Sequence, residues 1–334
     1  MNPRAKRSLF FLAKTVLSVG LLYWLLSGGM LGRVIAETRD RFHPIPFAIG
    51  LLSFAVSNIL GGCQWNLLLR AQGIRIGWRK AISLYYVGLF FSNFLPANIG
   101  GDVIKVVDVY RSTGRGGGAV AATMVDRAAG LAVLTILAAV AVVPTLSVLG
   151  REPFLILVPV LLVLFLGAGL MMLSRRVSRL TLRAAGHIPF LWVRKKTESV
   201  LTALFLYRDQ RGALFRALAI ALPVQTLRIG VHYLAARSIG IEAPAVYFFL
   251  FIPLIAVFIA LPISINGLGV RESLGVYLYA RIGIPQELAF SISFLAYLIG
   301  VVVSLLGGGI FLLRSGVPKK AGSVPVLQRD DRSR

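Results

Sequence analysis

The sequence has very few of the residues that build disulfide frameworks and metal clusters. Its 334 residues include one cysteine, Cys63, and three histidines, at positions 43, 187 and 232. A single cysteine cannot close a disulfide within the chain, and the histidines are too scattered for a typical zinc site. We therefore expect no disulfide-stabilised secreted domain, no metal site and no cofactor.

Acidic residues are also scarce. Thirteen Asp and Glu residues stand against 36 Lys and Arg residues, which gives a formal net charge of +23. Such an excess can indicate a nucleic-acid partner, but the chain has no recognisable nucleic-acid-binding motif or soluble basic domain. In membrane proteins, cationic loops orient the helices and contact anionic headgroups. The charge therefore favours membrane lipids as partners and argues against nucleic acid.

Several signatures of catalysis are missing. The sequence has no Walker A motif, no HExxH sequence and no legible Ser-His-Asp arrangement. None of its polar stretches is long enough for a soluble catalytic domain. We expect neither an ATPase within this chain nor a typical hydrolase.

Long apolar runs are abundant. Hydrophobic residues make up 57% of the chain and charged residues only 15%, whereas about a quarter of a soluble domain is charged. Runs of about 20 apolar residues can cross a bilayer as helices. The sequence predicts an all-α polytopic membrane protein, with the first helix an uncleaved span rather than a signal peptide. The expected full crossings lie near residues 8–26, 46–69, 119–149, 154–173, 217–236 and 290–313.

Two further apolar segments are interrupted in similar ways. LPANIGGD at 95–102 and LPISINGLGVRE at 261–272 each combine Leu-Pro with an asparagine, glycines and a carboxylate. Proline ends a helix and glycine permits a sharp turn, so each motif predicts a break at membrane depth. Such a break must be shielded by protein or face a watery cavity. The break residues are Pro96, Gly100, Gly101, Pro262, Gly267 and Gly269, with Asn98 and Asn266 beside them.

The distribution of Lys and Arg sets the expected topology. Cations near the N-terminus, at 70–80, at 175–216 and after residue 313 should all lie in the cytoplasm. The number of crossings between these cytoplasmic segments must be even. Six crossings plus two re-entrant hairpins, 81–112 and 245–281, meet this condition, and the hairpins would enter from opposite faces as in inverted-repeat transporters. Two pairs of full crossings would preserve the same parity. We expect one membrane domain over 1–313 with an interfacial amphipathic connection at 175–216, and a disordered tail over 314–334.

Charged residues inside apolar segments are the candidate functional residues, because such charges are costly unless they have partners or water. Asp102 and Lys105 follow the first break, and Asp126-Arg127 interrupts the apolar run 119–149. Adjacent helical side chains point about 100° apart, so Asp126 and Arg127 should meet different partners. The blander interpretation is that these residues lie on a solvated cytoplasmic face or reach out to the interface.

The second half of the chain has a similar set. Arg271 and Glu272 follow the second break, at the start of a helix whose N–H groups would favour an anion. Arg228 and His232 lie four residues apart, and therefore on one helix face. Arg271 and Glu272 could instead lie in an external loop. Arg228 and His232 could instead pack against Glu272 or backbone carbonyl groups.

The motifs LPANIGGDVIKVVDVYR, ATMVDRAAGL and LPISINGLGVRE resemble those of the flippase-like family named after the membrane region of lysylphosphatidylglycerol synthase. The resemblance covers nearly all of residues 10–313 and includes Gly130, the last position of the motif Asp-Arg-x-x-Gly. It implies an integral protein of the cytoplasmic membrane with a role in lipid translocation. The sequence departs from the full synthase, since only a short polar tail follows residue 313. We therefore expect no aminoacylation, and the cargo stays open between an anionic phospholipid, a polyprenyl lipid and a glycolipid.

The leading hypothesis is a lipid flippase or scramblase without its own ATPase. Arg127, Arg271, Lys105, Asn98 and Asn266 would contact the headgroup. The residues expected to tune the charge or carry coupling protons are Asp102, Asp126, Glu272, Arg228 and His232. Two alternatives stay open: a membrane-embedded glycosyl- or lipid-transferase, and a non-catalytic partner subunit of a separate transferase. The sequence sets no oligomeric state.

Overall fold

The computed structural model describes residues 39, 41–94, 100–150, 152–186, 191–260, 267 and 269–315. Several predictions fall outside these ranges. They concern the first helix at 8–26, the break residues Pro96, Asn98, Pro262 and Asn266, and the tail after residue 315.

All the regular elements within these ranges are helices, as the apolar runs predict. The α-helices are α3 (Pro44–Ala71), α4 (Trp78–Phe94), α5 (Gly100–Thr113), α6 (Gly116–Leu149), α7 (Leu157–Leu173), α8 (Arg175–Gly186), α9 (Leu191–Leu206), α10 (Arg211–Arg237), α11 (Ala245–Ala260), α12 (Val270–Ala280) and α13 (Gln286–Ser315), and two short 3-10 turns, η1 (Pro153–Ile156) and η2 (Tyr207–Asp209), precede α7 and α10. Within the described residues, five stretches are long and apolar enough to cross a membrane: α3, α6, η1 with α7, α10 and α13. The prediction of an all-helical, multi-spanning membrane protein is confirmed.

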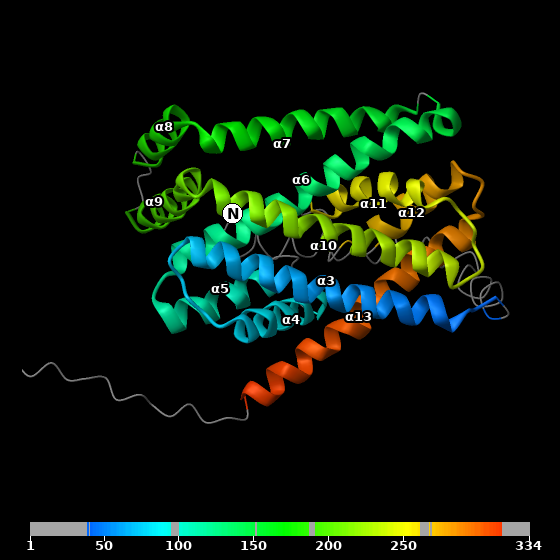
Figure 1. Cartoon of the computed structure of the whole chain (residues 1–334), viewed down its shortest axis with the longest axis horizontal. Coiled ribbons are helices and arrows are strands. Elements are labelled where there is room, and N and C mark those ends of the chain that lie inside the picture. Colours follow the sequence, from blue (N-terminus) through cyan, green and yellow to red (C-terminus); the bar gives the residue numbers. More distant parts are fainter. Residues whose placement is uncertain are drawn as a thin grey trace, which may run out of the picture.

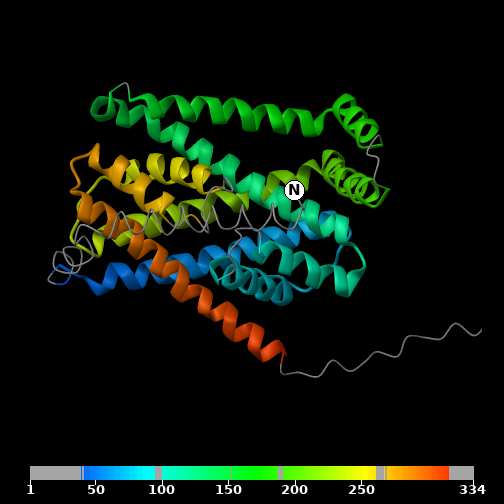
Figure 2. The same ribbon diagram turned by 180° about the vertical axis from the view of Figure 1, so that it is seen from behind.

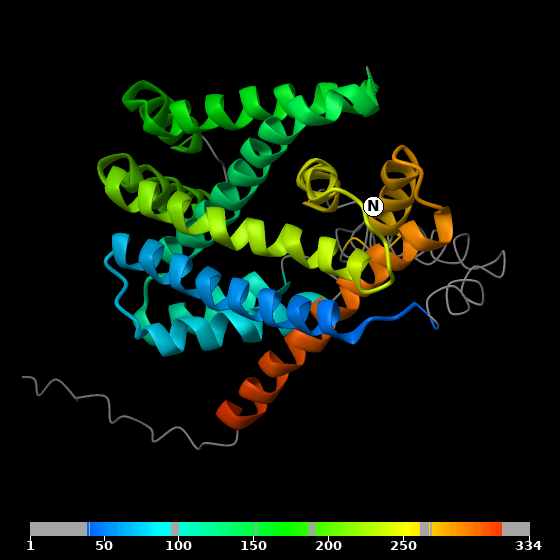
Figure 3. The same cartoon turned by 45° about the vertical axis from the view of Figure 1, so that its right-hand side comes forward.

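The long helices form one bundle (Figure 1). Helices α3 and α10 pack along each other, while α13 crosses the bundle obliquely and contacts α4 and α12. Seen from behind and from the side, α7 runs along the outside and joins the bundle through α6 (Figures 2 and 3). Most of α7 is exposed, with Val163 and Leu170 at 71% and 70%. In a membrane this apolar surface faces lipid.

The two expected hairpins are pairs of short packed helices. Helices α4 and α5 contain 17 and 14 residues, and α11 and α12 contain 16 and 11. At 1.5 Å per residue, none exceeds about 26 Å, less than the roughly 30 Å of a hydrocarbon core. These lengths suit re-entrant segments, and the re-entrant topology stays a prediction.

Two boundaries differ from the sequence expectation. Helix α6 begins at Gly116 rather than near residue 119, so Gly116, Gly117 and Gly118 already belong to it, and Gly114 just before it has a positive φ of 72°. The glycines serve packing here, since a Cβ at Gly117 would overlap the Ser199 hydroxyl of α9. Helix α10 begins at Arg211 rather than near 217. Exposed arginines at the end of an apolar helix reach water through their long side chains and do not terminate it.

The two largest apolar clusters among the described residues stabilise the bundle. One surrounds Trp65 and Leu68 of α3 and includes residues of α4, α5 and α6. The other surrounds Phe248 and Phe251 of α11 and includes residues of α6, α10, α12 and α13. The polar side chains described next lie where these two clusters meet.

The connection 175–216 forms helices at one end of the bundle, on the left in Figure 1. Arg175, Arg179 and Arg183 are exposed and recur every four residues of α8, which places them on one face. Gln72 Nε2 donates to the Ala203 carbonyl at 2.7 Å, and the Tyr207 hydroxyl donates to the Leu68 carbonyl at 2.8 Å. These two bonds fix the connection to the end of α3.

Candidate functional site

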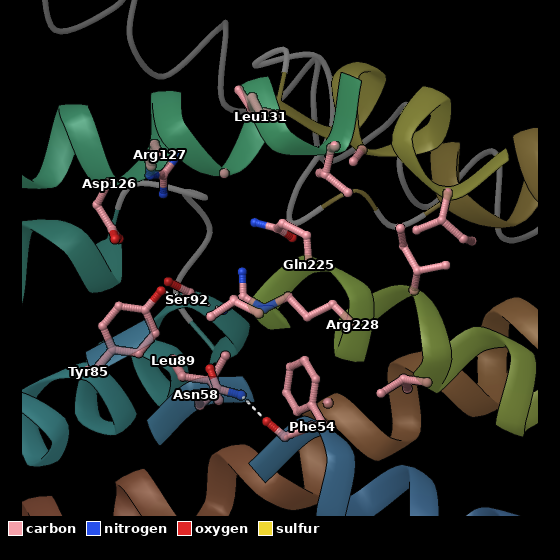
Figure 4. Close-up of a pocket in the computed structure, with 18 of the residues that line it drawn as sticks. Phe54, Asn58, Tyr85, Leu89, Ser92, Asp126, Arg127, Leu131, Gln225 and Arg228 are labelled. Carbon is pink, nitrogen blue, oxygen red and sulfur yellow. Dashed lines mark hydrogen bonds between the residues drawn. The ribbon is translucent and has the colours of Figure 1, made fainter. Parts of the chain in front are cut away.

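A cavity of about 470 Å³ lies inside the bundle, enclosed by residues of α3, α4, α5, α6, α10, α11, α12 and α13 (Figure 4). Its wall contains seven of the charged or titratable residues singled out from the sequence. They are Asp102, Lys105, Asp126, Arg127, Arg228, His232 and Arg271. Residues from four separate helices, spread over 170 positions of the chain, therefore meet around one space.

Asp102 is the centre of an ion-pair network. It lies in the first turn of α5, and its carboxylate accepts from Lys105 Nζ at 2.8 Å. The other carboxylate oxygen pairs with Arg127 Nε of α6. Asp102 thus joins its own helix to α6, and its position directly after the break sets where this connection forms.

Lys105 is almost completely buried, with 5% of its surface exposed. Its ammonium group lies 4.4 Å from the centre of the Tyr85 ring and 5.2 Å from that of Trp65. Aromatic faces attract cations, and the carboxylate of Asp102 adds the opposite charge. Three neighbouring groups therefore replace the water that this ammonium loses.

Asp126 and Arg127 meet different partners, although they are adjacent. Arg127 pairs with Asp102, while Asp126 is buried within electrostatic range of Lys105 and Arg228. Asp126 thus adjoins both the α5 network and the α10 residues. The burial of Asp126 does not fit the alternative in which both residues reach out to the interface, whereas the Arg127 side chain is 47% exposed.

Helix α10 directs a polar stripe into the cavity. Gln225, Arg228 and His232 are spaced by three and four residues, and all three line it. Arg228 extends toward α4 (Figure 4), and its Nη2 donates to the Tyr85 hydroxyl at 3.4 Å. Arg228 Nε and His232 Nδ1 are buried and have no hydrogen-bond partner among the described side chains and backbone. Unsatisfied buried nitrogens of this kind are costly unless water or a ligand meets them.

The second break motif supplies Arg271. This residue lies in the first turn of α12, and its guanidinium stacks 4.8 Å from the centre of the Tyr297 ring. Glu272 points elsewhere: it is buried, and its carboxylate accepts from the Gly269 N–H at 2.8 Å. Glu272 thus caps α12 and does not line the cavity. Gly267 and Gly269 have φ values of 74° and 80°, which disfavour any other residue.

Seven polar residues of the described cavity wall were not identified from the sequence: Asn58, Gln64, Tyr85, Ser92, Asn93, Gln225 and Tyr297. Asn58 is fully buried in α3, and its Nδ2 donates to the Phe54 carbonyl at 2.7 Å. A polar residue within an apolar span was a usable signal for Asn58 and Gln225. Gly130 faces Gln225, and a Cβ at Gly130 would lie 2.6 Å from Gln225 Nε2. Gly130 therefore leaves room for that amide.

The cavity is cationic. Its wall holds four cations, Lys105, Arg127, Arg228 and Arg271, against the two carboxylates Asp102 and Asp126. The formal excess is two positive charges when His232 is counted as neutral. In the described part of the chain, no three His, Cys, Asp or Glu side chains are placed to hold a metal ion.

Comparison with known proteins agrees with this geometry. The family model of the lysylphosphatidylglycerol synthase TM region matches residues 11–308. The chain belongs to this family. The match includes every residue of the cavity wall and both break motifs. This member of the family is therefore an integral, multi-pass membrane protein.

A more distant relative is a UPF0104 membrane protein of Pyrococcus horikoshii. It is 26% identical over 112 residues, which are 33% of this chain and 32% of the relative. The chain thus aligns with only about a third of that protein. No solved structure matches the sequence.

Proposed function

We propose that this protein moves a lipid with an anionic headgroup between the leaflets of a membrane, without an ATPase of its own. One observation carries the proposal: a cavity with a cationic excess lies inside a bundle whose outer surface is apolar. An anionic headgroup could occupy such a cavity while its acyl chains stay in lipid. The family's name specifies a phospholipid product, which supports a phospholipid as the cargo.

The cationic end of the bundle supports a location in the cytoplasmic membrane with both termini inside. Exposed cations gather at the ends of α3, α7 and α10 and on α8 and α9. They include Arg75, Arg79, Arg175, Arg176, Arg179, Arg183, Arg194, Lys195, Arg211 and Arg216. Cations favour the cytoplasmic side of a membrane protein.

A leaflet-asymmetry assay tests the proposal. Purified protein is reconstituted into vesicles that contain a fluorescent phosphatidylglycerol, and an impermeant quencher reports which molecules have reached the outer leaflet. We expect the wild type to move the lipid, and Arg127→Ala or Arg271→Ala to slow it about tenfold, because each change removes a cation that lines the path.

The matched control is Arg237→Ala, because Arg237 lies on α10 outside the cavity and pairs with the exposed Glu242. It should transport like the wild type. Unchanged transport in both the Arg127 and the Arg271 variants would rule out this assignment. A new lipid product in the same vesicles, detected by mass spectrometry, would instead support a transferase. Loss of all transport unless a co-purifying enzyme is added would support a partner subunit.

A further inference from the structure

The charges of the cavity separate into two adjoining halves. The neutral half consists of Asp102, Lys105, Asp126 and Arg127, whose formal charges cancel. The cationic half consists of Asn58, Gln225, Arg228, His232 and Arg271, and its two guanidinium groups give it a formal charge of two when His232 is neutral.

The neutral half is occupied with internal contacts. Asp102 binds both Lys105 and Arg127, and the Lys105 ammonium also faces two aromatic rings. An incoming anion would have to compete with Asp102 for these cations. This half therefore lines the path and holds α5 against α6, while the phosphate binds in the other half.

We propose that the cationic half binds the phosphate ester of the cargo through Arg228 and Arg271. This inference rests on the proposed function, because it names the chemical group that the same cavity takes up. Arginine has a planar fork of N–H donors that matches phosphate oxygens. Here the two forks come from different helices, α10 and α12, so they can address different oxygens of one tetrahedral group.

The most direct evidence for an anion site is at Arg228. Its Nε is buried and has no acceptor among the described groups, although its Nη2 reaches Tyr85. A buried guanidinium nitrogen without an acceptor is costly, and a phosphate oxygen would satisfy it. His232, one turn further along α10, has a buried Nδ1 in the same condition.

Arg271 is held in position by its ring contact. Its guanidinium face lies over Tyr297 at 4.8 Å, and within electrostatic range of His232. Stacking uses the face of the guanidinium, whereas its N–H groups point outward in the plane. The ring contact therefore helps to hold the Arg271 guanidinium at the cavity wall.

The neighbouring amides extend the site beyond the phosphate. Asn58 is fully buried, lines the cavity, and its Oδ1 has no described donor. Gln225 reaches the same space because Gly130 has no Cβ. Amides both donate and accept, which suits the hydroxyl or ester oxygens next to a phosphate.

Calorimetry on the full-length protein in a neutral detergent tests this inference. The probe is dihexanoyl phosphatidylglycerol, and the phosphate-free comparison is dihexanoylglycerol. We expect the first to bind and the second not to bind. Arg228→Gln and Arg271→Gln should each weaken binding about tenfold or more, while Arg237→Gln should bind like the wild type. If a glutamine variant does not fold, the lysine variant should still show weaker binding, because it keeps the charge and loses the fork.

Competition identifies the source of the phosphate. If glycerol 3-phosphate and inorganic phosphate displace the short-chain lipid at concentrations similar to its own, the site binds both free phosphate and lipid phosphate. Displacement by the short-chain lipid alone would show that it binds a lipid headgroup. The inference would be overturned if Arg228→Gln and Arg271→Gln bound the lipid as tightly as Arg237→Gln does. It would also be overturned if the wild type bound dihexanoylglycerol as tightly as dihexanoyl phosphatidylglycerol.

The outcomes separate this inference from the proposed function. Arginine-dependent binding in a wild type that moves no lipid in vesicles would leave the phosphate site intact and remove the transport role. If the wild type moves lipid and both glutamine variants bind and transport like it, the transport role stands and the assigned phosphate site is wrong.

Discussion

Asp102→Asn should lower the free energy of unfolding by about 3 kcal/mol, because it removes the carboxylate shared by two cations and leaves one of them buried. Lys105 is 5% exposed and cannot turn to water without leaving its place between Tyr85 and Trp65. The uncharged amide of asparagine still fills the space, so the loss reports charge rather than packing. Unfolding in detergent, followed by circular dichroism, measures it.

Asp209→Asn is the matched control, since Asp209 makes an exposed ion pair with Arg208 at 3.3 Å. Such surface pairs contribute little, and we expect no measurable change. The double variant Asp102→Asn/Lys105→Met should recover most of the lost stability, because no cation is then left buried. An Asp102→Asn protein as stable as Asp209→Asn would contradict the view that Asp102 neutralises Lys105.

Gly101→Ala should destabilise the α4–α5 pair by about 2 kcal/mol, because its methyl group would overlap backbone. The added Cβ would occupy the space of the Gly88 carbonyl oxygen and of the Ser92 hydroxyl of α4. A carbonyl oxygen cannot rotate away as a side chain can, so α5 must move. Because Ser92 and Asp102 line the cavity, transport should fall together with stability.

The control for this substitution is Gly309→Ala. Gly309 lies within α13, and nothing lies within 4 Å of a Cβ built there. Alanine favours helix over glycine by up to about 1 kcal/mol, so this variant should be as stable as the wild type or more so. If Gly101→Ala melts at the same temperature as Gly309→Ala, the claim that α4 and α5 are in close contact at Gly101 is wrong.

The sequence predicted the helices well, because apolar runs and their breaks decide where helices lie in a membrane protein. The run at 46–69 became α3, and the short segments on either side of the first break became α4 and α5. Helix boundaries that depend on tertiary packing were harder to predict from the sequence. At the start of α6, Gly117 packs against Ser199 of α9 and Gly118 packs against Ile74 and Gln72, contacts that the sequence does not show.

The candidate residues were found by the cost of a charge within an apolar segment, a rule that needs no structure. That rule identified Asp102, Arg127, Arg228 and Arg271, which share one cavity. Their pairing could not be predicted, because the ion pair between Asp102 and Arg127 depends on how α5 packs on α6. Tyr85 gave no signal in the sequence, since an aromatic residue in an apolar helix is ordinary until a cation lies on its ring.

Glu272 has a local structural role that the same rule does not reveal. Its charge suggested a role in tuning the cations of the path, and the structure places its carboxylate on the Gly269 N–H of its own helix. A glutamate in the third position of a helix often caps it, and this local explanation was available from the spacing Gly-x-x-Glu. The motif thus combines a cap with the arginine that faces the cavity.

The most direct test of the central claim, a water-filled cationic cavity inside the membrane bundle, is cysteine accessibility. Gln225→Cys is placed in a Cys63→Ala background and treated in vesicles with small, impermeant thiol reagents, one anionic and one cationic. Val140→Cys is the control, because Val140 is 69% exposed on the apolar surface of α6. We expect position 225 to react and position 140 to stay unlabelled, with the anionic reagent about tenfold faster than the cationic one at position 225. No reaction at position 225, or a faster reaction with the cationic reagent, would contradict the cavity as described.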